Sequence, residues 1–430
     1  MLQGSWQFNC QHAVHLVPTS SDTVACRAIT SSAWRKLLEQ RESWHSHVVA
    51  QPLLPAYKRY LLDQPDLHSA LLTTQRSTAC IQRGRAEATE FRYPAMRVQF
   101  MAASPAADAL ALYIGGQVTI IDLPDHAVRW HTTCDLNSTE SAAHWSPDST
   151  MFYSSCARSY KMLSSHDGTV LGTCRSTSRT VLHSAWHPQS TSLALVFDLG
   201  DVIVLRPGDD LVTDTSMGSK AAEVQWGRQV LKWAPNGQVL IHCTLKAVNF
   251  CSSTGSHLDQ VKFDMHAAIG SCAWSSSSDL LAVSFLQDSA GILFYNPEAV
   301  LMTRMVMARP CAQLAWAGSC LAAQCNGFVR VLSTAEPTFG AEICSVPAQV
   351  DYFTTPAWHI SGKYLALSCA DATIKVVHGR SGSTVWTWPD QGGAALQHRF
   401  PRHSPTWSAS GQELFFYLEH DAFGMMVAFQ

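Results

Sequence analysis

A short pattern recurs through most of this chain: a β-prone run that ends in a tryptophan, a polar turn and a second apolar run. Clear copies are "HSAWHPQSTSLALVF", "VLKWAPNGQVLIHC" and "TPAWHISGKYLALSC". The tryptophans of the series stand 41 to 49 residues apart, at Trp145, Trp186, Trp233, Trp274, Trp316, Trp358 and Trp407. A period of about 40 to 45 residues is typical of the four-stranded blade of a β-propeller. An earlier copy, "MRVQFMAASPAADALALYI", has Phe100 in the place of the tryptophan, so the pattern predicts eight blades, or seven if one copy is degenerate.

The residues inside each copy favour an all-β fold. Val, Ile, Leu, Phe and Tyr form runs of four to six residues, and turn residues separate them in "SPDS" and "APNG". Third strands are visible in "GDVIVLR" and "AGILFYN", and no helix-period segment lies between the runs. A single blade cannot cover its own sheet, whereas a ring of blades buries both faces. The tryptophans are therefore predicted to pack between neighbouring sheets and not to stack on ligands.

The two ends of the repeat region are expected to meet. The last copy ends after its third strand, "GMMVAF", so its fourth strand has to come from elsewhere. The upstream segment "STACIQRG" is the predicted source. Pairing the two ends of the chain would remove the open sheet edges that promote aggregation.

These copies resemble WD-repeats over residues 93–430. The best match is "GKYLALSCADATIKVVHGRSG", in which Asp371 takes the place of the family's structural turn aspartate. The family's Gly-His pair and its Trp-Asp dipeptide are absent, so the period and the turn carry the resemblance. It implies a WD-repeat-like β-propeller preceded by a separate N-terminal unit.

Residues 22–92 do not show the strand pattern of the repeats, and Ile29, Leu37 and Leu38 stand at helical spacing. We expect a small α-helical N-terminal domain, divided into a segment over 1–50 and a helical linker with a possible closing strand over 51–92. The stretch "AWRKLLEQRESW" resembles the C-terminal half of an F-box, with two tryptophans ten residues apart, although the family's Leu-Pro opening is not recognisable. The resemblance implies an adaptor-binding face made of Ile29, Trp34, Leu37, Leu38 and Trp44. The alternative is a helical cap that covers the propeller.

Composition and motifs argue against several other classes of protein. Charged residues make up only 15%, and the net charge of −3 gives no general attraction to nucleic acid or to an anionic membrane. No stretch of 18 apolar residues occurs. The fourteen cysteines form no CxxC pair, so we expect reduced, buried thiols and no metal or other cofactor. Phosphate-loop, zinc-protease and nucleophile-elbow motifs are all missing, so we expect no enzyme. The expected location is cytoplasmic, nuclear or both.

Two functions follow from the resemblances. The first is a substrate-recruiting F-box subunit of an SCF cullin-RING ubiquitin ligase, with a Skp-type adaptor and a cullin as partners and a protein or peptide substrate on the propeller. The alternative is a non-ligase WD-repeat scaffold for protein assembly. The predicted substrate face is the rim formed by the loops that enter each first strand and those between second and third strands. Cations on this rim would suit an acidic or phosphorylated peptide, and they are Arg158, Arg179, Lys246, Arg309 and His403.

Overall fold

The computed structural model describes residues 98–428 with gaps, together with Val14–Pro18, Val24–Ala28, Ile81 and Glu87–Arg92. The gaps are 106–108, 115–116, 123–126, 134–142, 157–158, 176–180, 198–200, 213–229, 245, 264–267, 287–290, 348–354, 370–372, 389–403, 409–410 and 419–422.

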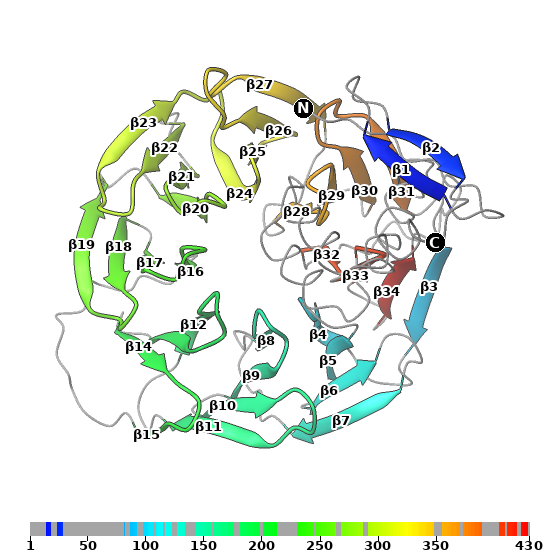
Figure 1. Ribbon diagram of the computed structural model, residues 1–430. Helices are drawn as coiled ribbons and strands as arrows, with labels where there is room; N and C mark the ends of the chain where they lie inside the picture. Colours follow the sequence, from blue (N-terminus) through cyan, green and yellow to red (C-terminus); the bar gives the residue numbers. More distant parts are fainter. Residues whose placement is uncertain are drawn as a thin grey trace.

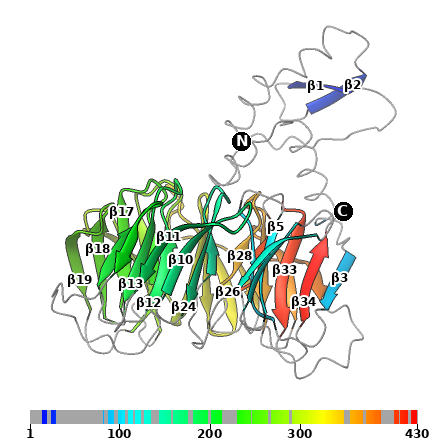
Figure 2. The same ribbon diagram turned by 90° about the horizontal axis from the view of Figure 1, so that it is seen from below.

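The described strands from residue 98 onward form a closed ring of consecutive antiparallel sheets, so the prediction of an all-β propeller is confirmed (Figure 1). In each sheet the first strand lies nearest the centre of the ring and the last lies outside. Six sheets contain four antiparallel strands, one contains four antiparallel strands and the added parallel strand β15 (Asp210–Val212), and one contains three. Seen from the side, the sheets stand next to one another as a disc (Figure 2).

The first half of the ring contains four sheets. Their strands are β4 (Val98–Ala103), β5 (Ala109–Ile114), β6 (Gln117–Asp122) and β7 (Val128–Thr133); β8 (Ala143–Trp145), β9 (Met151–Cys156), β10 (Ser159–Ser164) and β11 (Val170–Arg175); β12 (Val181–Trp186), β13 (Leu193–Phe197) and β14 (Val202–Leu205); and β16 (Val230–Trp233), β17 (Val239–Cys243), β18 (Ala247–Ser252) and β19 (His257–Lys262).

The second half contains the remaining sheets and the closing strand. Their strands are β20 (Ile269–Trp274), β21 (Leu281–Phe285), β22 (Ile292–Tyr295) and β23 (Leu301–Met305); β24 (Cys311–Ala317), β25 (Cys320–Cys325), β26 (Phe328–Ser333) and β27 (Glu342–Pro347); β28 (Ala357–Trp358), β29 (Tyr364–Ser368), β30 (Ile374–His378) and β31 (Thr384–Trp388); and β32 (Thr406–Trp407), β33 (Glu413–Leu418), β34 (Phe423–Ala428) and β3 (Glu87–Arg92).

One short strand joins the sheet before its own. β15 (Asp210–Val212) follows β14 in the chain but pairs in parallel with β11, Thr173 opposite Asp210. The turn before β15 makes this possible, because the N–H of Gly208 donates to the carbonyl oxygen of Leu171 at 2.9 Å. Gly208 has a φ of 92°, a conformation that glycine adopts without strain. Among the described residues, β14 is therefore the last strand of its sheet.

The ring is closed by an upstream strand, but not by the segment that the sequence pattern indicated. All six residues of β3 pair antiparallel with all six of β34, Glu87 opposite Ala428. The segment "STACIQRG" instead contributes Ile81, which is completely buried in a cluster between the last two sheets. The error has a physical reason: an outer edge strand needs no apolar run, so the polar "EATEFR" gave little strand signal.

The predicted packing role of the tryptophans is confirmed. Those of the series are buried except Trp316, which is partly exposed. Several donate the indole N–H to a carbonyl oxygen of the preceding sheet, as Trp145 does to Ala102 at 2.9 Å and Trp358 does to Ala315 at 3.0 Å. The assignment of Phe100 to the tryptophan position is wrong. Ala103 holds it, because Ala103 pairs with Leu110 as Trp186 pairs with Leu193, and Phe100 corresponds to His183, since both strands carry a β-bulge at the same place.

The N-terminal unit is described only in part. Within the predicted helical segment 1–50, the described residues are the strands β1 (Val14–Pro18) and β2 (Val24–Ala28), which pair antiparallel. These described residues are therefore strands, in contrast to the prediction of a helical segment, and each of the two contains valine, which favours strands. The expected helices over 29–80 and the turn aspartate Asp371 lie outside the described residues.

Candidate functional site

The predicted site residues are described only in part. The five residues of the proposed adaptor face lie outside the described residues, as do Arg158, Arg179 and His403 of the predicted rim. Lys246 lies between β17 and β18, and Arg309 lies between β23 and β24. Because successive strands alternate in direction, these two connections emerge on the same face of the disc.

Arg309 is engaged with the neighbouring loop of its own sheet. Its guanidinium donates to the carbonyl oxygen of Asn326 at 3.0 Å and lies 5.6 Å from the centre of the Phe328 ring. These contacts hold an exposed cation at the rim in a defined place. Lys246 is half-buried, and its main-chain carbonyl accepts a hydrogen bond from the N–H of Phe263.

The chain segment that leads to Arg309 is unusually apolar for a surface. Seven large hydrophobic residues are exposed among the described residues, and Val128, Val170 and Leu258 are dispersed over three different sheets. The other four fall within seven consecutive residues, and they are Val300, Leu301, Met302 and Val306, exposed by 55%, 51%, 57% and 77%. Three of them lie on or beside β23, the outermost strand of its sheet, and Val306 directly follows it. Clustered exposure of this kind marks interaction sites, whereas isolated exposed residues need no explanation.

Local structure fixes this strand firmly in place. A tight turn delivers the chain to it, with the N–H of Val300 donating to the side-chain oxygen of Asn296 at 2.8 Å. At its other end, Met305 and Met307 are buried in the cluster shared with the β24–β27 sheet. Gly291 lies so close to the main chain of Met305 that a Cβ atom there would be 1.9 Å from its carbonyl oxygen. The exposed side chains therefore stand on an ordered strand that has no strand paired on its outer side among the described residues.

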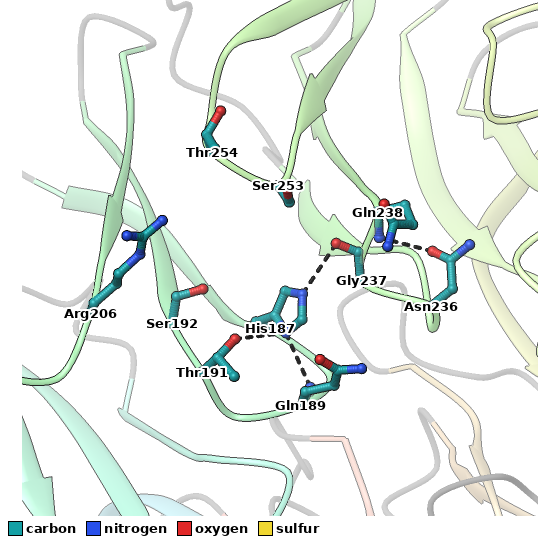
Figure 3. Close-up of a pocket in the computed structure, with 10 residues that line it drawn as sticks. All are labelled: His187, Gln189, Thr191, Ser192, Arg206, Asn236, Gly237, Gln238, Ser253 and Thr254. Carbon is teal, nitrogen blue, oxygen red and sulfur yellow. Dashed lines mark hydrogen bonds between the residues drawn. The ribbon is translucent and has the colours of Figure 1, made fainter.

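A shallow cavity of about 400 Å³ lies on the opposite face of the disc, between the β12–β14 and β16–β19 sheets (Figure 3). Its walls are the turns that follow β12, β14, β16 and β18, and they present amides, hydroxyls and a single charged side chain, that of Arg206. The central side chain is His187, directly after the tryptophan of its sheet.

Both ring nitrogens of His187 are committed to the fold. Its Nε2 lies 3.1 Å from the carbonyl oxygen of Gly237 and so carries the proton, and its Nδ1 accepts the N–H of Gln189 at 3.2 Å (Figure 3). The ring also packs edge-on against Trp233. These contacts give His187 a structural role, in which it joins the two sheets.

The contact between His187 and Gly237 is one of several contacts of the same kind. In each, the turn between the first and second strands of one sheet touches the equivalent turn of the neighbouring sheet. Where a histidine projects, the next turn has glycine: Gly237 has a φ of 74°, and a Cβ there would lie 2.2 Å from His187 Nε2. Elsewhere a serine takes the same turn position and bonds to the preceding turn. Ser278 Oγ, for example, accepts the N–H of Asn236 at 2.8 Å. The histidines after the tryptophans, His187 and His359, are thus buried and bonded to turns.

No chemistry-bearing cluster accompanies these surfaces. In the part of the chain that the structure describes, His, Cys, Asp and Glu side chains nowhere gather in threes suited to a metal ion. In the same part, no helix combines the length and the apolarity needed to span a membrane. All nine described cysteines are free, and seven are buried, as predicted for them.

The fold is similar to solved β-propellers of the WD40 type. The C-terminal WD40 domain of Sif2 matches with a TM-score of 0.62 at 11% identity, covering 80% of this chain and 98% of that one. Chaetomium thermophilum Sqt1, bound to the N-terminus of ribosomal protein L10, matches with a TM-score of 0.59 at 14% identity, covering 78% of this chain and 98% of that one. The computationally designed protein Ika8 matches with a TM-score of 0.60 at 13% identity, covering 79% and 98%.

At these identities the likeness concerns the fold alone. Neither a protein-family model nor a curated protein sequence matches this chain, so no comparison supports an F-box. The chain has a WD40-type β-propeller fold.

Proposed function

We propose that this protein is a non-catalytic scaffold whose propeller binds an extended segment of another protein along β23. The observation that carries the proposal is the clustering of exposed apolar side chains at Val300, Leu301, Met302 and Val306 on one outermost strand. Water contact with such a cluster is unfavourable, and covering it with a partner's apolar side chains would recover that free energy.

The strand also supplies the polar half of a docking site. The outer side of an edge strand presents main-chain N–H and C=O groups that can pair with an added strand. Specificity would come from alternate side chains, because residues on one strand point to opposite faces of the sheet. Arg309, held at the end of the same segment by Asn326 and Phe328, would favour a partner with an acidic group beyond its apolar residues.

The fold is suited to this use. One of the similar structures, that of Sqt1, contains the N-terminus of ribosomal protein L10, so a propeller of this architecture does bind a chain terminus. That pairing concerns Sqt1, and the partner of the present chain is inferred here only from the chemistry of β23.

The test compares two lysine substitutions on this strand with one elsewhere. Met302→Lys with Val306→Lys should abolish capture of the protein's cellular partners, quantified by mass spectrometry against the wild type. Val170→Lys is the matched control, because Val170 is also an exposed apolar residue, at 53%, but stands alone on β11. Equal partner recovery from the wild type and the double variant would contradict the proposal, provided that both variants keep the wild-type thermal transition.

A second copy of the chain is the alternative occupant of β23, and purified protein distinguishes it. Sedimentation of the wild type over a wide concentration range should show a monomer. Dimerisation that Met302→Lys abolishes and Val170→Lys leaves intact would assign the strand to self-association instead.

A ubiquitin-ligase role is a second candidate, supported by the sequence pattern of Trp34, Leu37 and Trp44. In that case the substrate receptor would bind a Skp-type adaptor and a cullin through Ile29, Trp34, Leu37, Leu38 and Trp44. Replacing Trp34 and Trp44 together by alanine should abolish co-purification of the adaptor and leave the propeller's unfolding transition unchanged. If adaptor binding is absent in the wild type, or if both properties fall together in the variant, the helical-cap interpretation is correct.

The cationic rim is a separate proposal about the substrate. Arg158, Arg179, Lys246, Arg309 and His403 would receive a phosphorylated or acidic peptide through charge-assisted hydrogen bonds. Titration with phosphorylated and unphosphorylated forms of one peptide separates phosphate recognition from simple solubilisation of the rim, since equal affinities would exclude the former.

A further inference from the structure

Two cysteines face each other across the first two strands of the β24–β27 sheet. Cys311 opens β24 and Cys325 ends β25, and the two residues are direct cross-strand partners. Their Sγ atoms lie 3.0 Å apart. A disulfide requires about 2.05 Å, so a movement of about 1 Å would join the sulfurs without a rearrangement of the strands.

Other sheets of the ring have different residues at the positions equivalent to Cys311 and Cys325. The corresponding cross-strand pair is Val181 with Phe197 in the β12–β14 sheet and Ile269 with Phe285 in the β20–β23 sheet. All four of those side chains are buried and apolar. Packing at this point of a sheet is therefore satisfied by ordinary hydrophobic residues, and nothing in the fold requires a thiol on each strand.

The hydrogen bond between the thiols, together with nearby charges, makes the two thiols unequal. The hydrogen bond with Cys311 lowers the pKa of Cys325, and the cations Arg330 and Arg309 act in the same direction, whereas burial and the carboxylate of Glu342 oppose them. The same hydrogen bond, with burial, raises the pKa of Cys311. Cys325 is thus the cysteine that more readily forms a thiolate, and the thiolate is the form that reacts with oxidants. Cys311 is the resolving cysteine, which can react with an oxidised Cys325 to form a disulfide.

A second cysteine pair has nearly the same spacing but is more deeply buried. Cys243 and Cys272 have Sγ atoms 2.9 Å apart, between the β16–β19 and β20–β23 sheets. Both are completely buried, whereas Cys325 retains 5% of its exposure at the rim. Burial raises the pKa of Cys243 well above its usual range, although the charge of Lys232 acts in the opposite direction. This pair is an internal control for two thiols that are in contact but shielded from solvent.

We propose that Cys311 and Cys325 are a redox-active pair that a hydroperoxide converts to a cross-strand disulfide. The Cys325 thiolate attacks the terminal peroxide oxygen, the O–O bond breaks, and the leaving alkoxide or hydroxide takes a proton. The Cys311 sulfur then displaces water from the resulting sulfenic acid, and its proton leaves with that water. Two thiols and one hydroperoxide give one disulfide, one alcohol or water, and one further water, with two electrons passing from sulfur to oxygen.

The bond would form in the buried cluster that also holds the end of the proposed docking strand. Cys311 and Cys325 belong to the same buried cluster as Met305 and Met307, which anchor β23 and the residue after it. The inference does not rest on the proposed function, because it concerns only thiol chemistry in the isolated protein.

The test uses the full chain under native conditions with hydrogen peroxide as oxidant. After alkylation of the remaining thiols, digestion and mass spectrometry should find Cys311 and Cys325 lost in parallel. They should reappear as one linked peptide lacking two hydrogens, which dithiothreitol restores. Oxidation of this pair should be at least about tenfold faster than that of Cys243 and Cys272. The partly exposed Cys320 and Cys344, which belong to a different packing cluster, serve as controls for accessibility.

The variant Cys311→Ser distinguishes the attacking role of Cys325 from the resolving role of Cys311. In Cys311→Ser, the sulfenic acid of Cys325 has no resolving thiol, so a 1,3-dicarbonyl reagent should label Cys325 in the variant and not in the wild type. The proposal is overturned if the wild-type pair stays reduced while Cys320 and Cys344 react, if both cysteine pairs oxidise at the same rate, or if Cys325 is over-oxidised without a linked peptide. The wild-type peptide map decides the matter even if the variant fails to fold.

Discussion

The Nε2 atom of His359 lies 3.1 Å from the carbonyl oxygen of Gly411, a residue of the turn in the following sheet. The Nδ1 atom accepts the N–H of Ser361 at 3.1 Å, and the ring packs edge-on against Trp407. His359 therefore repeats at a second place in the ring the contact that His187 makes with Gly237. Both contacts bind one sheet to the next at the face opposite Arg309.

The glycine of this contact is predicted to be irreplaceable. Gly411 has a φ of 72°, and a Cβ there would lie 2.6 Å from His359 Nε2 and 2.4 Å from Ile360 Cδ1. Gly411→Ala should lower the free energy of unfolding by about 3 kcal/mol or more, since conformational strain of about 1 kcal/mol adds to steric overlap. Gly362→Ala is the control, because Gly362 has a similar φ of 67° but no atom near the added Cβ. Equal losses in urea unfolding would show that strain alone matters.

Acid is predicted to weaken the ring through its buried histidines. Burial lowers the pKa of His359 to about 4 and, together with the charge of His183, that of His242 to about 4. Between pH 6.5 and about 4 the unfolded chain binds protons that the folded chain excludes. The contribution of the two neutral histidines to the free energy of unfolding is complete above pH 6.5. It declines as the pH falls to about 4, by up to about 3 kcal/mol for each fully buried histidine.

Urea unfolding at several pH values between 7.5 and 4.5 measures this decline. His359→Gln, which keeps a donor for Gly411, should reduce the slope of stability against pH. An unchanged slope in that variant would assign the acid sensitivity to other groups.

The tryptophans should differ in how much their indole N–H contributes. Trp358 donates to Ala315 in the preceding sheet at 3.0 Å, whereas the indole nitrogen of Trp274 is buried without a hydrogen-bond partner. Trp358→Phe should therefore lower the free energy of unfolding by about 1 kcal/mol more than Trp274→Phe, because only the former leaves a carbonyl without its donor. Denaturant titrations of the two variants decide this, and an equal loss would mean that ring volume alone sets the contribution.

Ile81, which is buried between the last two sheets, is predicted to stabilise the closed ring. Ile81 is completely buried against residues of the last two sheets, among them Tyr364 and Phe416. Ile81→Ala should lower the free energy of unfolding by about 2 to 4 kcal/mol through the cavity that it leaves. Val306→Ala, at a residue exposed by 77%, should have little effect. Thermal unfolding of the two variants is the measurement, and a neutral Ile81→Ala would show that β3 alone closes the ring.

Periodicity along the chain determined most of the fold. The recurring tryptophans and the β-prone runs between turns identified the strands, because burial of both faces of every sheet leaves the same pattern in each copy. The packing role of Trp145 and its counterparts followed from that regularity. The position of Ala103 did not, since an alanine gives no aromatic signal at the place where the other copies have tryptophan.

Only the tertiary structure decided which segments meet. Glu87–Arg92 closes the ring although its polar sequence resembles a loop, because its strand conformation is imposed by pairing with β34. The thiol contact of Cys311 with Cys325 and the exposure of Met302 likewise depend on how strands are placed side by side. Repetition in the sequence reports how each sheet is built, whereas contacts between distant residues arise from the closure of the ring, which no local pattern encodes.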